Sequence, residues 1–215
     1  VALPTYPFDR VRHWVALPEP EAAKPAARRD PAALMHELKW RPRLRETAAE
    51  PLAGTAWTIF ADAGGVGREL ADRLTASGAQ CTVVTGAAAY ARTTDGFQIS
   101  PANRDHMTQM WAERPAGGTE RVVHLWSLDA RGDEAPTPTD AVGPSCASVL
   151  HLAQVLGESR AAGATPRVTI VTRGAQAAGS TERVSLAQTP VWGLARTLPL
   201  EYPETAWVRI DLDPE

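Results

Sequence analysis

Cysteine and lysine are both scarce in this chain of 215 residues. Cys81 and Cys146 are the two cysteines, and Lys24 and Lys39 are the two lysines. Two isolated cysteines favour buried thiols in a reducing compartment over a disulfide framework or a zinc site, so no metal site is expected. The two lysines leave few candidates for a mechanism that needs a catalytic amine.

The chain also lacks a strong net charge and a long apolar run. A net charge of -3 gives no electrostatic signature for nucleic acid or an anionic membrane. No apolar run approaches the roughly 20 residues that span a bilayer, and no basic-then-apolar leader opens the chain. We therefore expect a cytoplasmic protein without nucleic-acid or membrane partners. Its hydrophobic content of 44% and charged content of 22% are those of an ordinary globular domain with an appended segment.

The segment 57–74 has the pattern of a buried strand, a glycine turn and a helix. Aromatic and branched residues fill 57–60, glycines cluster at 64–67, and apolar residues repeat at helical spacing over 66–74. This order is typical of the first half of a dinucleotide-binding βαβ unit, in which the glycines let a pyrophosphate approach the helix N-terminus.

The glycine turn departs from the T-G-x-x-x-G-x-G loop of short-chain reductases. Gly65 and Gly67 keep the last two glycines, but Phe60 and Ala61 stand where the threonine and the first glycine belong. Asp62 places a carboxylate where diphosphate oxygens would lie, and like charges repel strongly in a partly dry site. We therefore expect that no cofactor binds here. The degenerate loop comprises Ala61, Asp62, Gly64, Gly65 and Gly67.

Further strands and helices alternate along the rest of the chain. Strands are expected at 80–85, 97–99, 121–128, 167–172 and 207–213. Helices are expected after Asn103, over about 142–161 with Asp140 as cap and Gly163 as end, and within 187–204. The fold class is therefore α/β: a truncated Rossmann-like, mostly parallel sheet of five or six strands with flanking helices, preceded by an extended linker.

The residues that catalyse reduction in short-chain dehydrogenases are missing. Those enzymes use a Tyr-x-x-x-Lys pair, but none of Tyr6, Tyr90 and Tyr202 has a lysine four residues later. The strand 80–85 ends neither in the arginine that holds the 2′-phosphate of NADPH nor in the acidic residue that binds the ribose of NAD. His124 is followed by bulky residues where a nicotinamide needs room. No catalytic residue is therefore predicted.

Residues 3–14 read L-P-T-Y-P-F-D-R-V-R-H-W. Taken alone, they are an extended, proline-containing terminus. They closely resemble the L-P-x-Y-P-F-x-R-x-R-[YH]-W signature of modular type I polyketide synthases, which follows the acyltransferase domain. The resemblance implies that residues 1–33 are a post-acyltransferase linker that contacts the acyltransferase and the ketosynthase.

Residues 187–213 resemble the A-x-x-x-x-W-G-L-x-R-x-x-x-x-E-x-P-E…x-x-D-L sequence that ends the structural subdomain of polyketide synthase ketoreductases. The resemblance implies that residues 34–215 are that subdomain, a degenerate Rossmann fold without its own cofactor. NADPH would then bind the partner catalytic half, which reduces the β-keto group of a polyketide on the acyl carrier protein of the parent module. Two alternatives remain open: an autonomous NAD(P)-dependent short-chain oxidoreductase, and a protein-docking module on a Rossmann-like fold.

Overall fold

The computed structural model describes residues 40–43, 51–115, 117, 120–130, 138–159, 166–178 and 184–214, with side chains from residue 143 onward in the 138–159 segment. The expected linker 1–33 lies outside these residues. The chain divides into two compact units, Val1–Pro42 and Arg43–Glu215. The described strands and helices all belong to the second unit.

Seven strands and four α-helices make up the described part. The strands are β1 (Ala56–Ala61), β2 (Gln80–Gly86), β3 (Ala91–Arg92), β4 (Gly96–Ile99), β5 (Glu120–His124), β6 (Arg167–Arg173) and β7 (Ala206–Leu212). The helices are α1 (Val66–Ala76), α2 (Arg104–Glu113), α3 (Pro138–Glu158) and α4 (Thr189–Glu201). None of the described helices is long and apolar enough to cross a membrane.

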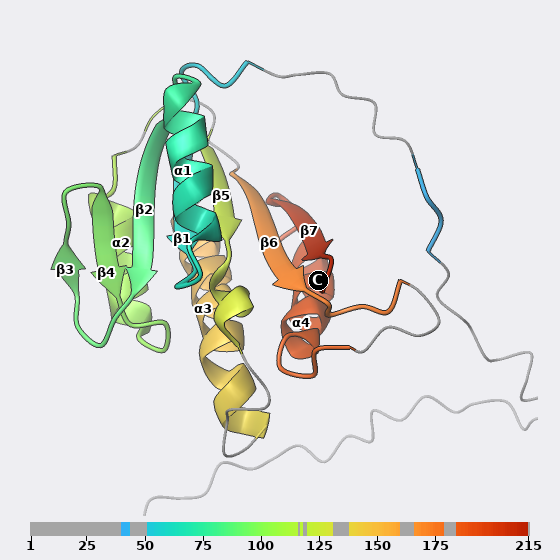
Figure 1. Cartoon of the computed structure of the whole chain (residues 1–215). Coiled ribbons are helices and arrows are strands. Elements are labelled where there is room, and N and C mark those ends of the chain that lie inside the picture. Colours follow the sequence, from blue (N-terminus) through green and yellow to red (C-terminus); the bar gives the residue numbers. More distant parts are fainter. Residues whose placement is uncertain are drawn as a thin grey trace, which may run out of the picture. The chain divides into compact units, whose positions relative to one another are not determined.

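The strands form one sheet in the order β3-β4-β2-β1-β5-β6-β7 (Figure 1). The neighbouring strands pair in parallel except β3, which pairs antiparallel with β4 at one edge. Branched and aromatic residues fill the central strands, as in sheets that are buried on both faces. The expected α/β class with a mostly parallel sheet is confirmed.

The two faces of the sheet are covered unequally in the described part. Helix α1 packs on one face with Ile59 and Val83, whereas α2, α3 and α4 pack on the other with Phe60 and Val84 (Figure 1). A parallel crossover normally carries a helix, but the connection from β2 to β4 carries the short strand β3 instead. Helix α1 is therefore the one described helix on its face.

The strand expected over 121–128 is too long. Strand β5 ends at His124, and Trp126–Asp129 form a short 3-10 helix. The Leu128 N–H donates to the Leu125 carbonyl over 2.9 Å, which turns the chain out of the sheet. The Trp126 indole N–H then donates to the Ala61 carbonyl over 3.0 Å. Apolar character alone could not reveal this turn, because the turn is as buried as the strand.

Two other expectations need correction. Helix α3 begins at Pro138, so Asp140 lies within its first turn and is not its cap; proline suits this position because the first N–H of a helix needs no intrahelical acceptor. The expected end at Gly163 lies outside the described residues.

Cys81 and Cys146 are free thiols, but both are only partly buried. Asn103 does cap α2, because its Oδ1 accepts the N–H groups of Asp105 and His106.

Candidate functional site

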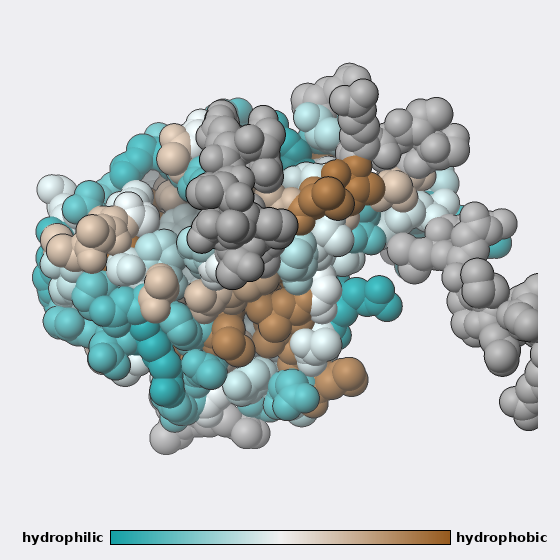
Figure 2. Space-filling view, turned by 90° about the horizontal axis from the view of Figure 1, so that it is seen from below, coloured by the Kyte–Doolittle hydropathy of each residue, from teal (hydrophilic) through white to brown (hydrophobic). Residues whose placement is uncertain are grey.

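The turn between β1 and α1 lies at the carboxyl end of the sheet, where Rossmann folds bind their ligands. Figure 2 looks onto this end and shows apolar residues beside hydrophilic ones. Gly65 has a φ of 93°, a left-handed conformation that favours glycine. A Cβ on Gly67 would lie 2.6 Å from the Ala61 Cα, so helix and strand approach too closely for a side chain there. Both glycines thus serve the geometry of the turn.

Asp62 follows directly after β1, and its side chain folds back over the start of α1. Asp62 Oδ1 accepts the N–H of Gly67 over 2.7 Å, and Oδ2 accepts the N–H of Val66 over 3.3 Å. Asp62 is 7% exposed, so these bonds are shielded from water. A carboxylate at this point also interacts favourably with the positive end of the helix dipole. The chain therefore supplies its own anion to the N-terminus of α1.

The residues of this turn do not fit the diphosphate of a nicotinamide cofactor. Such a group would need the N–H donors of Val66 and Gly67, which Asp62 already engages. It would also bring two negative charges close to a buried carboxylate, at a cost of several kcal/mol. Gly64 also lies close to this carboxylate, because a Cβ there would be 2.9 Å from Asp62 Oδ2. No step of a reduction is therefore assigned to this turn.

A second carboxylate engages the same loop. Asp129, at the end of the 3-10 helix after β5, accepts the N–H of Ala63 over 2.9 Å with Oδ1 and over 3.1 Å with Oδ2. The carbonyl of Phe60 meanwhile accepts the N–H of Leu125. The loops after β1 and β5 are thus hydrogen-bonded to each other across the carboxyl end of the sheet.

A third carboxylate engages the loop after β6. Asp211 on β7 accepts the hydroxyl of Thr172 over 2.7 Å and the N–H groups of Ala175 and Gln176 over 2.9 Å each. Gln188 adds an acceptor for the N–H of Arg173 over 2.8 Å. Backbone donors after β1 and β6, which a ligand could otherwise use, are therefore satisfied from within the chain.

His124 lies at the end of β5, beside this region, and is fully buried. Its Nε2 is 3.0 Å from the Ser148 hydroxyl, which donates to the Ser145 carbonyl over 2.9 Å, so Ser148 accepts the Nε2 proton. The ring packs against those of Phe60 and Trp126. Burial lowers the pKa of His124 from 6.5 to about 3, so the imidazole is neutral and packs in the core.

The tyrosines without a lysine four residues later lie elsewhere. The Tyr90 hydroxyl donates to Glu113 over 2.8 Å at the β3 side of the sheet. The Tyr202 ring packs against Gly157, where a Cβ would lie 2.6 Å from Tyr202 Cε1. Tyr6 lies outside the described residues. Neither described tyrosine therefore joins the loop at Asp62.

A shallow hollow lies on the outer flank of α1, over β2. Its lining includes Arg68, Thr75, Cys81 and Asp95, and Arg68 donates to Asp95 over 2.5 Å at its rim. The hollow is separate from the turn at Asp62 and shows no convergent set of catalytic groups. Among the described residues, no cluster of three or more His, Cys, Asp or Glu side chains could hold a metal ion.

Sequence reasoning identified Asp62 but missed Asp129, Asp211 and Gln188. Asp129 and Asp211 each lie at or just beyond the end of a strand or turn, a position that favours capping of nearby backbone N–H groups. That signal was present in the sequence. It does not reveal which loop each carboxylate meets, because the partners are 66 residues away for Asp129 and about 35 residues away for Asp211.

Relatives of known name are large synthases. The chain is 32% identical over 220 residues to polyketide synthase GfsA of Streptomyces halstedii, covering 98% of this chain and 3% of that protein. It is 25% identical to a phenolphthiocerol/phthiocerol polyketide synthase of Mycobacterium tuberculosis, covering 98% of this chain and 13% of that protein. The chain therefore spans a small part of the length of these relatives.

Solved structures with a similar fold include ketoreductases. A C2-type ketoreductase from a modular polyketide synthase has 26% identity and a TM-score of 0.56, over 79% of this chain and 34% of that chain. A multidomain structure with an adenylation domain and a ketoreductase, from a keto acid-selecting NRPS module, has a TM-score of 0.65 at 19% identity, over 81% of this chain and 14% of that chain. The second likeness shows the fold alone.

The family model described as "Polyketide synthase extender module SpnB, Rossmann fold domain" matches residues 11–215. This match confirms the resemblance found in the sequence, and the chain belongs to that family of ketoreductase-like Rossmann folds of polyketide synthase modules.

Proposed function

We propose that this chain is the noncatalytic structural half of a polyketide synthase ketoreductase. The observation that carries the proposal is the Asp62 carboxylate, which accepts the N–H groups of Val66 and Gly67 where a cofactor diphosphate would bind. A Rossmann fold that engages its own phosphate-binding donors keeps its shape without a ligand. Such a domain supports a neighbouring enzyme by packing against it.

On this proposal, residues 1–33 are the linker to the acyltransferase and the ketosynthase, and residues 34–215 are the structural subdomain. The catalytic half binds NADPH and reduces the β-keto group of a polyketide carried on the acyl carrier protein. The chain itself binds no cofactor and has no activity alone. The parent synthase works in the cytoplasm.

The distribution of exposed apolar side chains supports a packing role. In the second unit, large exposed hydrophobic residues include Leu186 at 79%, Leu200 at 81%, Leu150 at 41% and Ile210 at 43% exposure. Leu150 and Leu200 lie on α3 and α4, Leu186 lies in the turn before α4, and Ile210 lies on β7 on the opposite face of the sheet. Exposed apolar side chains of this size are available for contacts with another protein.

The proposal is tested by mixing the chain with a separately produced catalytic half. NADPH oxidation is measured with a β-keto thioester as substrate, for each polypeptide alone and for the mixture. We expect no oxidation by this chain alone, weak activity of the catalytic half alone and a clear increase in the mixture. The soluble yield of the catalytic half should rise together with its activity.

Direct titration of NADPH into the chain provides the control. We expect no saturable change in NADPH fluorescence for the native chain. Saturable binding in the micromolar range, or turnover by this chain alone, would support an autonomous oxidoreductase instead. Capture of a different partner, with no effect on the catalytic half, would support a docking module.

A further inference from the structure

Strand β7 is the last strand of the sheet, and no strand in the described part pairs with its outer edge. The carbonyl of Leu212 accepts the N–H of Gly174 on the β6 side. Because successive residues of a strand direct their backbone groups to opposite edges, Trp207, Arg209 and Asp211 direct theirs outward. A seven-residue row of this kind is a template for another strand.

The charged residues of β7 do not protect this edge. Arg209 donates to the Ala195 carbonyl over 3.0 Å and lies over the Trp192 ring of α4. The Asp211 carboxylate is engaged by Thr172 and by the loop after β6. Edge strands of monomeric proteins usually keep such charges in solvent to prevent pairing. Here Asp211 is engaged by the chain itself, and Arg209, although exposed, lies against α4.

The remaining side chains of β7 suit a covered position. Ile210 is 43% exposed and Val208 is partly exposed, and both lie on the sheet face that carries α1. No described helix covers β7 on that face (Figure 1). Parallel sheets are normally covered on both faces, so these residues indicate that a neighbouring element is missing.

The end of the described chain lies at the carboxyl ends of β6 and β7. Pro214 follows β7 and packs close to Gly174, where a Cβ would lie 3.2 Å from the Pro214 Cβ. The chain spans 3% and 13% of two large relatives, so relatives carry much more polypeptide than this chain. Any polypeptide that continues beyond this point starts beside the carboxyl end of β7.

We propose that the outer edge of β7 binds a β-strand of the catalytic ketoreductase half, which extends the sheet. This proposal rests on the proposed function and specifies its interface. Main-chain hydrogen bonds to residues 207, 209 and 211 would provide the pairing. Side chains of the added strand would cover Ile210 and Val208.

Hydrogen exchange and a matched pair of variants test this interface. Amide exchange of the chain is compared with and without a separately produced catalytic half, and the dissociation constant is measured for native chain, Ile210→Lys and Leu150→Lys. The two replaced residues are almost equally exposed, at 43% and 41%, but Leu150 lies on α3. In the complex, we expect the outward amides of β7 to exchange more slowly by a factor of about ten or more. Of the two variants, we expect only Ile210→Lys to raise the dissociation constant, by a factor of about ten or more.

Each outcome has a distinct meaning. If the native chain does not bind the catalytic half, the proposed function fails and the interface with it. If the halves bind but β7 exchanges unchanged and Ile210→Lys binds normally, only the interface is wrong. If Leu150→Lys raises the dissociation constant more than Ile210→Lys does, the interface lies on α3 and the proposal for β7 is wrong. The β7 amides of the chain without a partner could also exchange more slowly as the chain concentration rises. That result would assign the edge to a second copy of this chain and overturn the proposal.

Discussion

The β3 edge and the β7 edge of the sheet end in different ways. Strand β3 has two residues, and its Arg92 donates to Glu113 of α2 over 2.8 Å. Tyr90 donates to the same carboxylate, and burial together with this contact raises the pKa of the phenol to about 12. Hydrogen bonds from Gln109, Arg92 and Tyr90 lower the pKa of Glu113 to about 2. Strand β7 has seven residues; its Asp211 is bonded to the loop after β6, and its exposed Arg209 is bonded to α4.

This difference is the one expected if the proposed interface lies at β7 and the β3 edge stays exposed to solvent. A short strand with an exposed ion pair is a common way to prevent strand addition at a sheet edge. A long edge strand with exposed apolar side chains is typical of an edge that pairs with another chain. Four predictions test this comparison, in order of decreasing effect.

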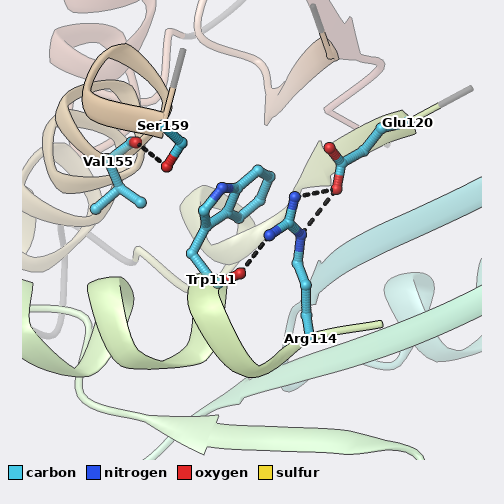
Figure 3. Close-up of polar contacts among 5 residues, drawn as sticks. All are labelled: Trp111, Arg114, Glu120, Val155 and Ser159. Carbon is cyan, nitrogen blue, oxygen red and sulfur yellow. Dashed lines mark hydrogen bonds and ion pairs between the residues drawn. The ribbon is translucent and has the colours of Figure 1, made fainter. Parts of the chain in front are cut away.

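The largest effect is expected at Arg114, which links the end of α2 to β5 in the interior of the sheet, away from both edges (Figure 3). Its guanidinium donates to Glu120 of β5 and to the Trp111 carbonyl. The guanidinium carbon also lies 3.3 Å from the centroid of the Trp111 ring. Because both charges are largely buried, Arg114→Met should cost about 3 kcal/mol of unfolding free energy, measured by urea denaturation. The exposed pair of Arg73 and Glu69 gives the control.

Arg73→Ala should change the unfolding free energy by less than about 0.5 kcal/mol, because solvent screens an exposed i,i+4 pair. An Arg114→Met variant as stable as Arg73→Ala would mean that the contact between α2 and β5 does not depend on this buried ion pair.

The next effect concerns Asp211 on β7. Asp211→Ala removes the acceptor of Thr172, Ala175 and Gln176 and should cost about 2 kcal/mol, while Asp211→Asn should retain part of the stability. Asp72→Ala, an exposed carboxylate on α1, should stay within about 0.5 kcal/mol of the native chain. Equal thermal melting of Asp211→Ala and Asp72→Ala would show that the inward position of Asp211 is not required.

The third prediction concerns the core, where the buried His124 should make the unfolding free energy depend on pH. Folding lowers the pKa of His124 from 6.5 to about 3, because burial disfavours the imidazolium. The unfolded chain therefore takes up the proton first, so stability is complete above pH 6.5 and declines as the pH falls toward 3. Between pH 7 and pH 5 the loss should be about 2 kcal/mol from this group.

Urea denaturation at both pH values measures this loss, and His124→Asn is the control. The variant should show a smaller difference between the two pH values, whatever its absolute stability. An unchanged difference would assign the acid sensitivity to other groups.

The smallest effect is expected for Ile210→Lys in the chain alone. Because Ile210 is 43% exposed, this change should alter the unfolding free energy by less than about 0.5 kcal/mol. Urea denaturation of the native chain and of Ile210→Lys, each without a partner, measures this change. A loss of stability of about 2 kcal/mol or more would show that β7 is part of the core and is no open edge.

The sequence predicted most of the elements, because their signals are local. The alternating strand and helix patterns gave β1, β2, β4, β6, β7 and the helices α1, α2 and α4 close to their observed bounds. The errors lie where the same signal has two causes. Leu125, Trp126 and Leu128 suggested a strand but belong to a largely buried turn, and a proline marked the true start of α3 before Asp140. The expected linker and the noncatalytic role remain predictions.

The sequence by itself determined the fold class and the altered glycine turn, because strand and helix periodicity and the glycine spacing act over a few residues. Only the tertiary structure decided what Asp129, Asp211 and the outer edge of β7 do. Asp129 meets Ala63 across 66 residues of chain, and Asp211 meets Gln176 across 35. The physical reason is that a carboxylate bonds to the backbone N–H groups that lie near it in space, and a short sequence pattern does not determine which groups these are.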